Sequence, residues 1–210
     1  MKSLVLKDLY NIGHNARQMF ILLLFLAVFL IPAAGGEGFI ITSTILCSMM
    51  TVTTFIFDEH CKWEKYALIM PVSRKDYVTG KYAVNLIFMI SGILFGIIAA
   101  LVSGLMKGSL NPLAVMGCAI AGFFLSLLYG SIIIPLIIKF GTESARIIMM
   151  GTILVPSAVI FGLYKLAKVL NINISDTVLA IILGVAGILI LILTAVSYRI
   201  SIGLFEKKEL

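Results

Sequence analysis

The residues that could carry chemistry gather in one stretch of this sequence, residues 58–81. Nine of the chain's 26 Asp, Glu, Lys and Arg residues and its single tryptophan lie there. His60 and Cys61 stand side by side in it, but a metal site needs three or four ligands at suitable spacing. The other histidine, His14, is far away in sequence, and no H-E-x-x-H or paired-carboxylate motif lies in an apolar run. An intramembrane enzyme is therefore disfavoured.

Nucleotide chemistry is also missing from the sequence. It contains no G-x-x-x-x-G-K-[ST] phosphate-binding loop, and an ATPase needs that backbone cradle and its lysine. We expect no cofactor and no metal on this chain. If ATP drives its function, ATP and Mg²⁺ bind to a separate partner subunit.

The composition is that of an integral membrane protein. Of 210 residues, 61% are hydrophobic and 12% are charged, whereas soluble domains average about 25% charged residues. The net charge of +6 does not predict nucleic-acid binding, because most of the basic residues flank apolar runs. The three cysteines suggest no disulfide framework.

Six apolar runs have the length of about 17–25 residues that a membrane-spanning helix needs. We therefore predict an all-α membrane fold with spans at Gln18–Ala34, Phe39–Phe57, Tyr82–Met106, Pro112–Ile138, Ile147–Tyr164 and Thr177–Tyr198. Residues 1–210 then form a single transmembrane domain. Its parts are an interfacial helix (1–17), spans one and two (18–57), a cytosolic segment (58–81), spans three and four (82–138), a cytosolic loop (139–146), spans five and six (147–198) and a cytosolic tail (199–210).

The basic residues predict the orientation. With the N-terminus inside, 13 Lys and Arg residues fall on the inner side and 3 on the outer side, which is a strong positive-inside bias. Both termini are expected in the cytosol. Before the first span, Val5, Leu9 and Ile12 share one helical face while Lys7 and Asp8 share the other. This pattern predicts an amphipathic helix lying in the inner interface.

The cytosolic segment is predicted to be a docking helix. Counted as a helix from Asp58, it carries an apolar stripe at Trp63, Tyr66 and Met70, with Asp58 among the charges opposite. Glu59 falls near the Trp63 side, where a carboxylate suits a basic group on a protein better than lipid. The alternative is an interfacial helix whose aromatic residues lie at headgroup level.

A second cytosolic element, residues 139–146, lies on the same predicted side. Thr142 is a candidate cap for the fifth span, and Glu143 and Arg146 form an i,i+3 pair at its start.

The order of these elements resembles a known family. The matching features are an N-terminal helix with Lys7-Asp8-Leu9, the run Asp58-Glu59…Trp63-Glu64…Leu68…Pro71-Val72-Ser73-Arg74, Lys81-Tyr82 at the third span, and Gly141…Glu143…Arg146 before the fifth. This resembles the membrane subunits of type-2 ABC exporters, in particular permeases that export phenol-soluble modulins and related peptides. The resemblance implies a coupling helix after the second span, seated on an ABC ATPase, and a second membrane subunit, identical or paralogous. The ATPase-coupling residues it implies are Asp58, Glu59, Trp63, Glu64, Tyr66, Met70, Arg74, Glu143 and Arg146.

The second and third spans are the candidate pathway for cargo. Hydroxyls and thioethers could contact a passing peptide, and the residues chosen are Met49, Thr51, Thr54, Asn85 and Met89. The alternative is that they satisfy helix–helix contacts. Small residues on the third and fourth spans, among them Gly92, Gly96 and Gly130, predict close helix packing within one subunit, with dimerisation as the alternative use.

The function predicted from these features is ATP-driven export of amphipathic or hydrophobic peptides. A permease for immunity or multidrug efflux, removing lantibiotic- or bacitracin-like peptides or hydrophobic drugs, would have the same architecture. A membrane scaffold without transport activity is the alternative from another class.

Overall fold

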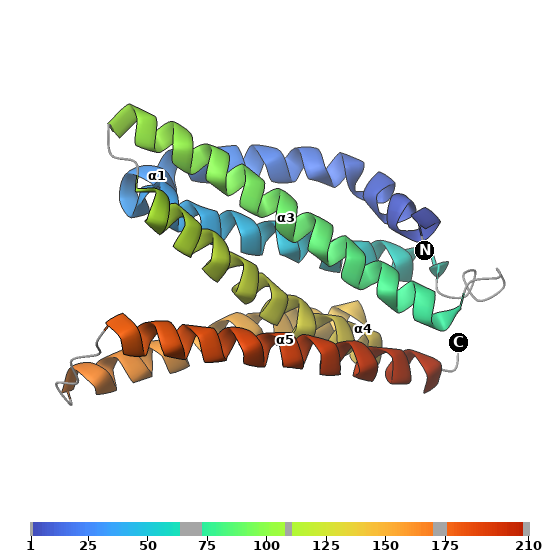
Figure 1. Ribbon diagram of the computed structural model, residues 1–210. Helices are drawn as coiled ribbons and strands as arrows, with labels where there is room; N and C mark the ends of the chain where they lie inside the picture. The colour runs from blue at the N-terminus through green and yellow to red at the C-terminus, as the bar shows by residue number, and fades with distance from the viewer. Residues whose placement is uncertain (1, 64–72, 108–110, 170–175, 208–210) are drawn as a thin grey trace.

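The computed structural model describes residues 2–63, 73–107, 111–169 and 176–207. Within these ranges it describes only the backbone of residues 2, 14–16, 33–34, 107, 144–183 and 207. Every regular element in this part of the chain is a helix. The helices are α1 (Lys2–His60), α3 (Arg74–Lys107), α4 (Pro112–Val169) and α5 (Asp176–Lys207). They run back and forth along one long axis, and both chain ends lie at the same end of the molecule (Figure 1).

Glycines reverse the chain inside the two longest helices. Gly35 interrupts α1 with φ 78° and ψ 163°, and Gly141 interrupts α4 with φ 80° and ψ 174°. Positive φ is accessible to glycine without the steric cost that a side chain adds. Each of these helices therefore folds back on itself almost without a loop, and the predicted loop 139–146 is reduced to a sharp break at Gly141.

Four helical stretches of the described chain are long and apolar enough to cross a membrane: Gly35–His60, Arg74–Met106, Pro112–Glu143 and Gly184–Glu206. A fifth candidate is the pair Ser3–Gly13 and Arg17–Pro32, which meet at a bend of 63°. The all-helical membrane fold is confirmed by these stretches. The count of six spans and the cytosolic placement of the termini stay predictions.

Glycines on α3 bring its backbone against the second half of α1. A Cβ added to Gly96 would lie 2.7 Å from Cα of Ile40, and one added to Gly92 would lie 2.8 Å from the carbonyl oxygen of Ser43. Ser43 Oγ in turn donates a hydrogen bond to the carbonyl of Gly92 at 3.0 Å. The predicted use of these small residues for packing within one subunit is confirmed.

We expect Gly96→Leu to destabilise the protein by more than the roughly 1–3 kcal/mol typical of overpacking. The new side chain would meet Ser43 Oγ and the backbone Cα of Ile40, and the backbone atom cannot rotate away. The measurement is the midpoint of thermal unfolding in detergent. Gly117→Leu is the matched control, because no described heavy atom lies within 4 Å of its Cβ position. Equal midpoints for the two variants would contradict the close approach.

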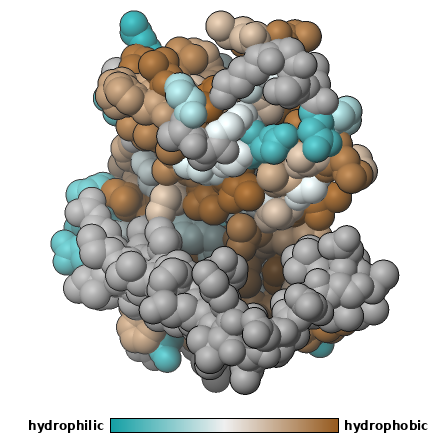
Figure 2. Space-filling view, turned by 90° about the vertical axis from the view of Figure 1, so that its left-hand side faces the viewer, coloured by the Kyte–Doolittle hydropathy of each residue, from teal (hydrophilic) through white to brown (hydrophobic). Residues whose placement is uncertain are grey.

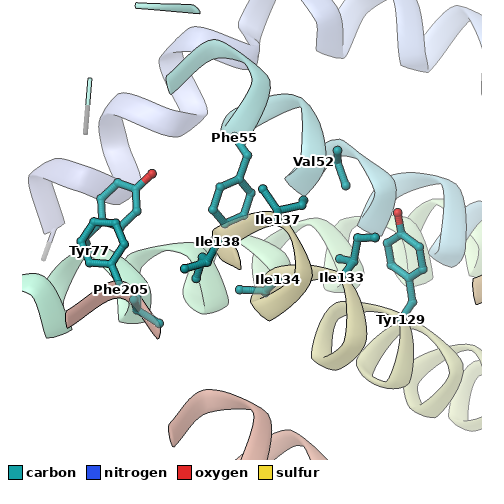
Figure 3. Close-up of a cluster of buried hydrophobic side chains, with 10 residues drawn as sticks. Val52, Phe55, Tyr77, Tyr129, Ile133, Ile134, Ile137, Ile138 and Phe205 are labelled. Atoms are coloured by element: carbon teal, nitrogen blue, oxygen red, sulfur yellow. The ribbon is translucent and has the colours of Figure 1, made fainter. Parts of the chain in front are cut away.

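The largest cluster of buried hydrophobic side chains joins four helices near the end that carries the chain termini (Figure 3). Tyr77 from α3 stacks on Phe205 from α5 with ring centroids 4.8 Å apart and an angle of 13° between the rings. Phe55 of α1 and Ile138 of α4 belong to the same cluster. This core holds the end of α1, the start of α3 and the end of α5 against the middle of α4, just before its break at Gly141.

At the end of the molecule opposite the chain termini, hydrophobic side chains are exposed on the surface. Figure 2 shows it with the described hydrophobic residues, in brown, exposed between hydrophilic patches. Several large side chains of the first part of α1 and of α3 are also exposed, Phe25 at 61% and Ile98 at 60% among them. Lipid suits such surfaces better than water does.

Candidate functional site

Four charged side chains meet at the end of the helix bundle that carries the chain termini, and we call them the charge quartet: Lys7, Asp8, Asp58 and Lys81. Lys81 Nζ lies 2.9 Å from Asp8 Oδ2 and 2.6 Å from Asp58 Oδ2. Lys7 Nζ lies 2.5 Å from Asp58 Oδ1 and 3.0 Å from Asp8 Oδ1. Each lysine therefore bridges both carboxylates, and the quartet connects the first turns of α1, the end of α1 and the start of α3.

The quartet is buried and carries no net charge. The side chains of Asp8, Asp58 and Lys81 are at most 4% exposed, and that of Lys7 is 19% exposed. Tyr77 donates a hydrogen bond to Asp58 at 3.0 Å, and Lys81 donates one to Thr54 at 3.1 Å. Buried ions persist when they are paired and hydrogen-bonded in this way, and removing one partner leaves an uncompensated charge.

The quartet corrects two predictions made from helical faces. Asp8 was assigned to the polar face of an interfacial helix, but it is buried on one face with Leu4 and Ile12. Asp58 was expected among the charges opposite the Trp63 stripe of a docking helix, but it is buried and binds Lys7 and Lys81. A helical-wheel assignment considers one helix alone. A charged residue can be buried when oppositely charged residues of other helices contact it. Asp58, predicted to couple to the ATPase, lies inside this chain.

Glu59 connects the two predicted cytosolic segments. Its Oε2 accepts hydrogen bonds from the backbone N–H of Thr142 at 2.9 Å and from the Thr142 hydroxyl at 2.5 Å. Thr142 is the first residue after the break at Gly141, so the carboxylate lies at the positive end of the helix dipole. Glu59 of α1 therefore caps the start of the second half of α4.

Trp63 lies just beyond the end of α1. The predicted continuous helix from Asp58 is interrupted, because α1 ends at His60 and Lys62 has a φ of 50°. Trp63 packs against the large hydrophobic cluster, and Lys7 Nζ lies 4.6 Å from the centroid of its ring. The indole therefore touches the quartet through a cation–π contact.

Arg74 forms hydrogen bonds to the end of α5. It is in the first turn of α3, where Ser73 caps the helix by accepting a hydrogen bond from the backbone N–H of Asp76 at 3.1 Å. The Arg74 guanidinium donates to the backbone carbonyls of Phe205 and Glu206. A cation at those carbonyls suits the negative end of the α5 dipole.

The remaining predicted coupling residues are only partly placed. Glu143 is exposed, one residue after Thr142. Arg146 belongs to α4, but its side chain is outside the description. Glu64, Tyr66 and Met70 lie outside the described residues. Glu59, Trp63, Arg74 and Glu143 thus share the end of the bundle that holds the quartet.

The predicted pathway residues lie in helix contacts. Asn85 Oδ1 accepts hydrogen bonds from Ser48 at 2.8 Å and Thr51 at 3.0 Å. Thr51, Thr54, Asn85 and Met89 are at most 3% exposed, and Met49 packs against the large hydrophobic cluster. Cargo would reach these side chains only if α1 and α3 separated.

A family model described as an ABC-2 family transporter protein matches residues 3–206. The chain belongs to the ABC-2 family of transporter proteins. Comparisons with curated proteins and with solved structures give no match.

As a member of the ABC-2 family, this chain is a multi-pass membrane subunit of an ABC transporter. The family also implies association with an ABC ATPase subunit.

The sequence did not predict the quartet, because the two lysines were interpreted as markers of membrane orientation and the two aspartates as exposed charges of separate helices. A signal for it does exist in the sequence. Residues four positions apart share a helical face. Thr54 lies four positions before Asp58, and Tyr77 lies four positions before Lys81. A single charge at the end of such a partly apolar face indicates a polar contact inside the bundle.

Proposed function

We propose that this chain is the membrane-spanning subunit of an ATP-driven exporter that moves amphipathic or hydrophobic peptides out of the cell. It acts with a cytosolic ABC ATPase and a second membrane subunit, which is identical or paralogous. The membrane is the plasma membrane of a bacterium.

The observation that carries the coupling role is the bond between Glu59 and Thr142. It links the two segments predicted to face the ATPase across 83 positions of sequence. The exposed residues around the bond carry both signs of charge, with Lys62, Lys139 and Glu143 among them. A partner that moves the end of α1 would therefore also move the start of the second half of α4.

The apolar cargo class is supported by a groove of about 890 Å³ between the first half of α1 and the last part of α3. Its lining is almost wholly apolar, with Leu24, Val28, Phe95 and Val102 among the residues. Ser103 is a hydroxyl in that lining, and its Oγ already donates to the carbonyl of Ala100 at 2.9 Å. Such a surface suits hydrophobic side chains better than small charged molecules.

The test is reconstitution with a candidate ABC ATPase subunit from the same organism. We expect the two to co-purify in detergent and ATP hydrolysis in proteoliposomes to rise several-fold with the membrane subunit present. A synthetic amphipathic Leu/Lys helix is the cargo probe, and a scrambled peptide of the same composition is its control. We expect the amphipathic peptide to stimulate hydrolysis further and to accumulate across the membrane.

Other outcomes point to the other functions. Stimulation by lantibiotic- or bacitracin-like peptides, with none by the amphipathic helix, would favour the immunity permease. A chain that neither binds the ATPase nor changes its hydrolysis rate would contradict export and leave a scaffold role.

A further inference from the structure

Lys7 differs from the other members of the charge quartet in its exposure. Its side chain is 19% exposed, whereas those of Asp8, Asp58 and Lys81 are at most 4% exposed. Two lysines balance two carboxylates, so the quartet is neutral only while Lys7 is in place. Lys7 is therefore the member that can leave toward solvent, and its departure would give the buried remainder a net negative charge.

Lys7 also touches the segment that follows α1. Its ammonium lies 4.6 Å from the centre of the Trp63 ring while it binds Asp58 at 2.5 Å. A shift of the indole would remove the cation–π contact on one side of this ammonium. Trp63 and Lys7 are consequently coupled, although they lie at opposite ends of α1.

The ion pairs of the quartet hold the first turns of α1 against α3. Leu4, Asp8 and Ile12 form their buried face, and Asp8 is bound by Lys81 of α3 at 2.9 Å. Beyond Gly13 the chain bends by 63° into the next helical stretch. The stretch Ser3–Gly13, which we call the N-terminal helix, can thus swing about this bend when its ion pairs break.

We propose that the charge quartet is a latch that holds the N-terminal helix against α3, and that the ATPase opens it by displacing Trp63 and thereby Lys7. This proposal rests on the proposed function, since the displacing partner is the ATPase. Lys81 stays between Asp8 and Asp58 as the fixed part of the latch. The latch is closed in the structure described here.

A disulfide can lock the latch. The Cβ position of Gly80 lies 3.6 Å from Cβ of Leu4, which is within the usual Cβ–Cβ range for disulfides of about 3.5–4.5 Å. Leu4→Cys and Gly80→Cys are combined in a chain whose native cysteines, at 47, 61 and 118, are replaced by alanine. Leu6→Cys with Gly80→Cys is the matched control, because Leu6 is 57% exposed.

The experiment uses the full complex with its ATPase in proteoliposomes. We expect the Leu4–Gly80 cysteine pair to cross-link readily without nucleotide and the Leu6 control pair to cross-link poorly. Binding of a non-hydrolysable ATP analogue with Mg²⁺ should slow cross-linking at least fivefold. The locked complex should lose at least four fifths of the ATP hydrolysis stimulated by the membrane subunit, and a reductant should restore it.

A second variant tests Lys7 itself. Lys7→Gln should slow cross-linking of the same pair several-fold in the absence of nucleotide, whereas Lys62→Gln, at an exposed position, should leave the rate unchanged. Full activity in the locked complex, or failure of the pair to cross-link, would overturn the latch. Failure of the proposed function looks different, because the ATPase would then neither bind nor be stimulated even after reduction.

Discussion

Replacing Lys81 with methionine will lower the stability of the protein by about 3–5 kcal/mol, the cost of breaking a buried ion pair from one side. The methionine fills much of the space of the lysine but leaves Asp8 and Asp58 with Lys7 alone. Their carboxylates lie within 2.9 Å of Lys81 Nζ in the native protein. The measurement is the temperature at which half of the detergent-solubilised protein loses its monodisperse peak in size-exclusion chromatography.

Two further variants separate charge from side-chain shape. Lys75→Met removes an exposed lysine from the same helix and should change stability by less than about 0.5 kcal/mol. The double variant Lys81→Met with Asp8→Asn keeps one lysine, Lys7, and one aspartate, Asp58, so the site is neutral again. It should therefore recover part of the lost stability. Wild-type stability in the single Lys81 variant would show that the quartet does not hold the helices together.

Changing Glu59 to lysine will uncouple ATP hydrolysis from export while the protein still inserts into the membrane. The change removes the acceptor of two hydrogen bonds from Thr142. A hydrogen bond to a charged group is worth about 1.5–3 kcal/mol, so the loss of even one of the two should weaken the contact between the two predicted cytosolic segments by roughly 10- to 160-fold. A lysine there also places a positive charge at the positive end of a helix. The measurement is peptide transported per ATP hydrolysed in proteoliposomes.

His60→Lys is the matched control for this prediction. It adds a positive charge at the neighbouring, exposed position, and Thr142 keeps its contact with Glu59. Its transport per ATP should stay close to wild type. Equal losses in both variants would show that surface charge at the end of α1 matters, rather than the contact with Thr142.

Sequence reasoning predicted the helical membrane fold because long apolar runs have one common solution in lipid. It also predicted that small residues pack helices closely, and Gly92 and Gly96 lie against the backbone of α1. It did not predict how the chain turns at Gly35. Such a reversal depends on one backbone conformation, and a glycine in an apolar run gives no sign of which conformation it adopts.

The contacts of the candidate site were not predicted from the sequence. Trp63, Glu59 and Arg74 lie at one end of the bundle, and their contacts are within the chain, with Lys7, Thr142 and α5. A helical wheel describes one helix at a time. The partners of Asp58 come from positions 51 residues before and 23 residues after it, and no periodicity in the sequence encodes such a meeting.

The order of synthesis gives the charge quartet a further consequence for membrane insertion. Asp8 and Asp58 both emerge from the ribosome before Lys81, which follows Asp8 by 73 positions. Until α3 arrives, the growing chain has two of these carboxylates and only Lys7 to offset them. In this biosynthetic intermediate, the first 60 residues thus carry one unbalanced negative charge at the quartet. The synthesis of α3 adds Lys81, which balances it.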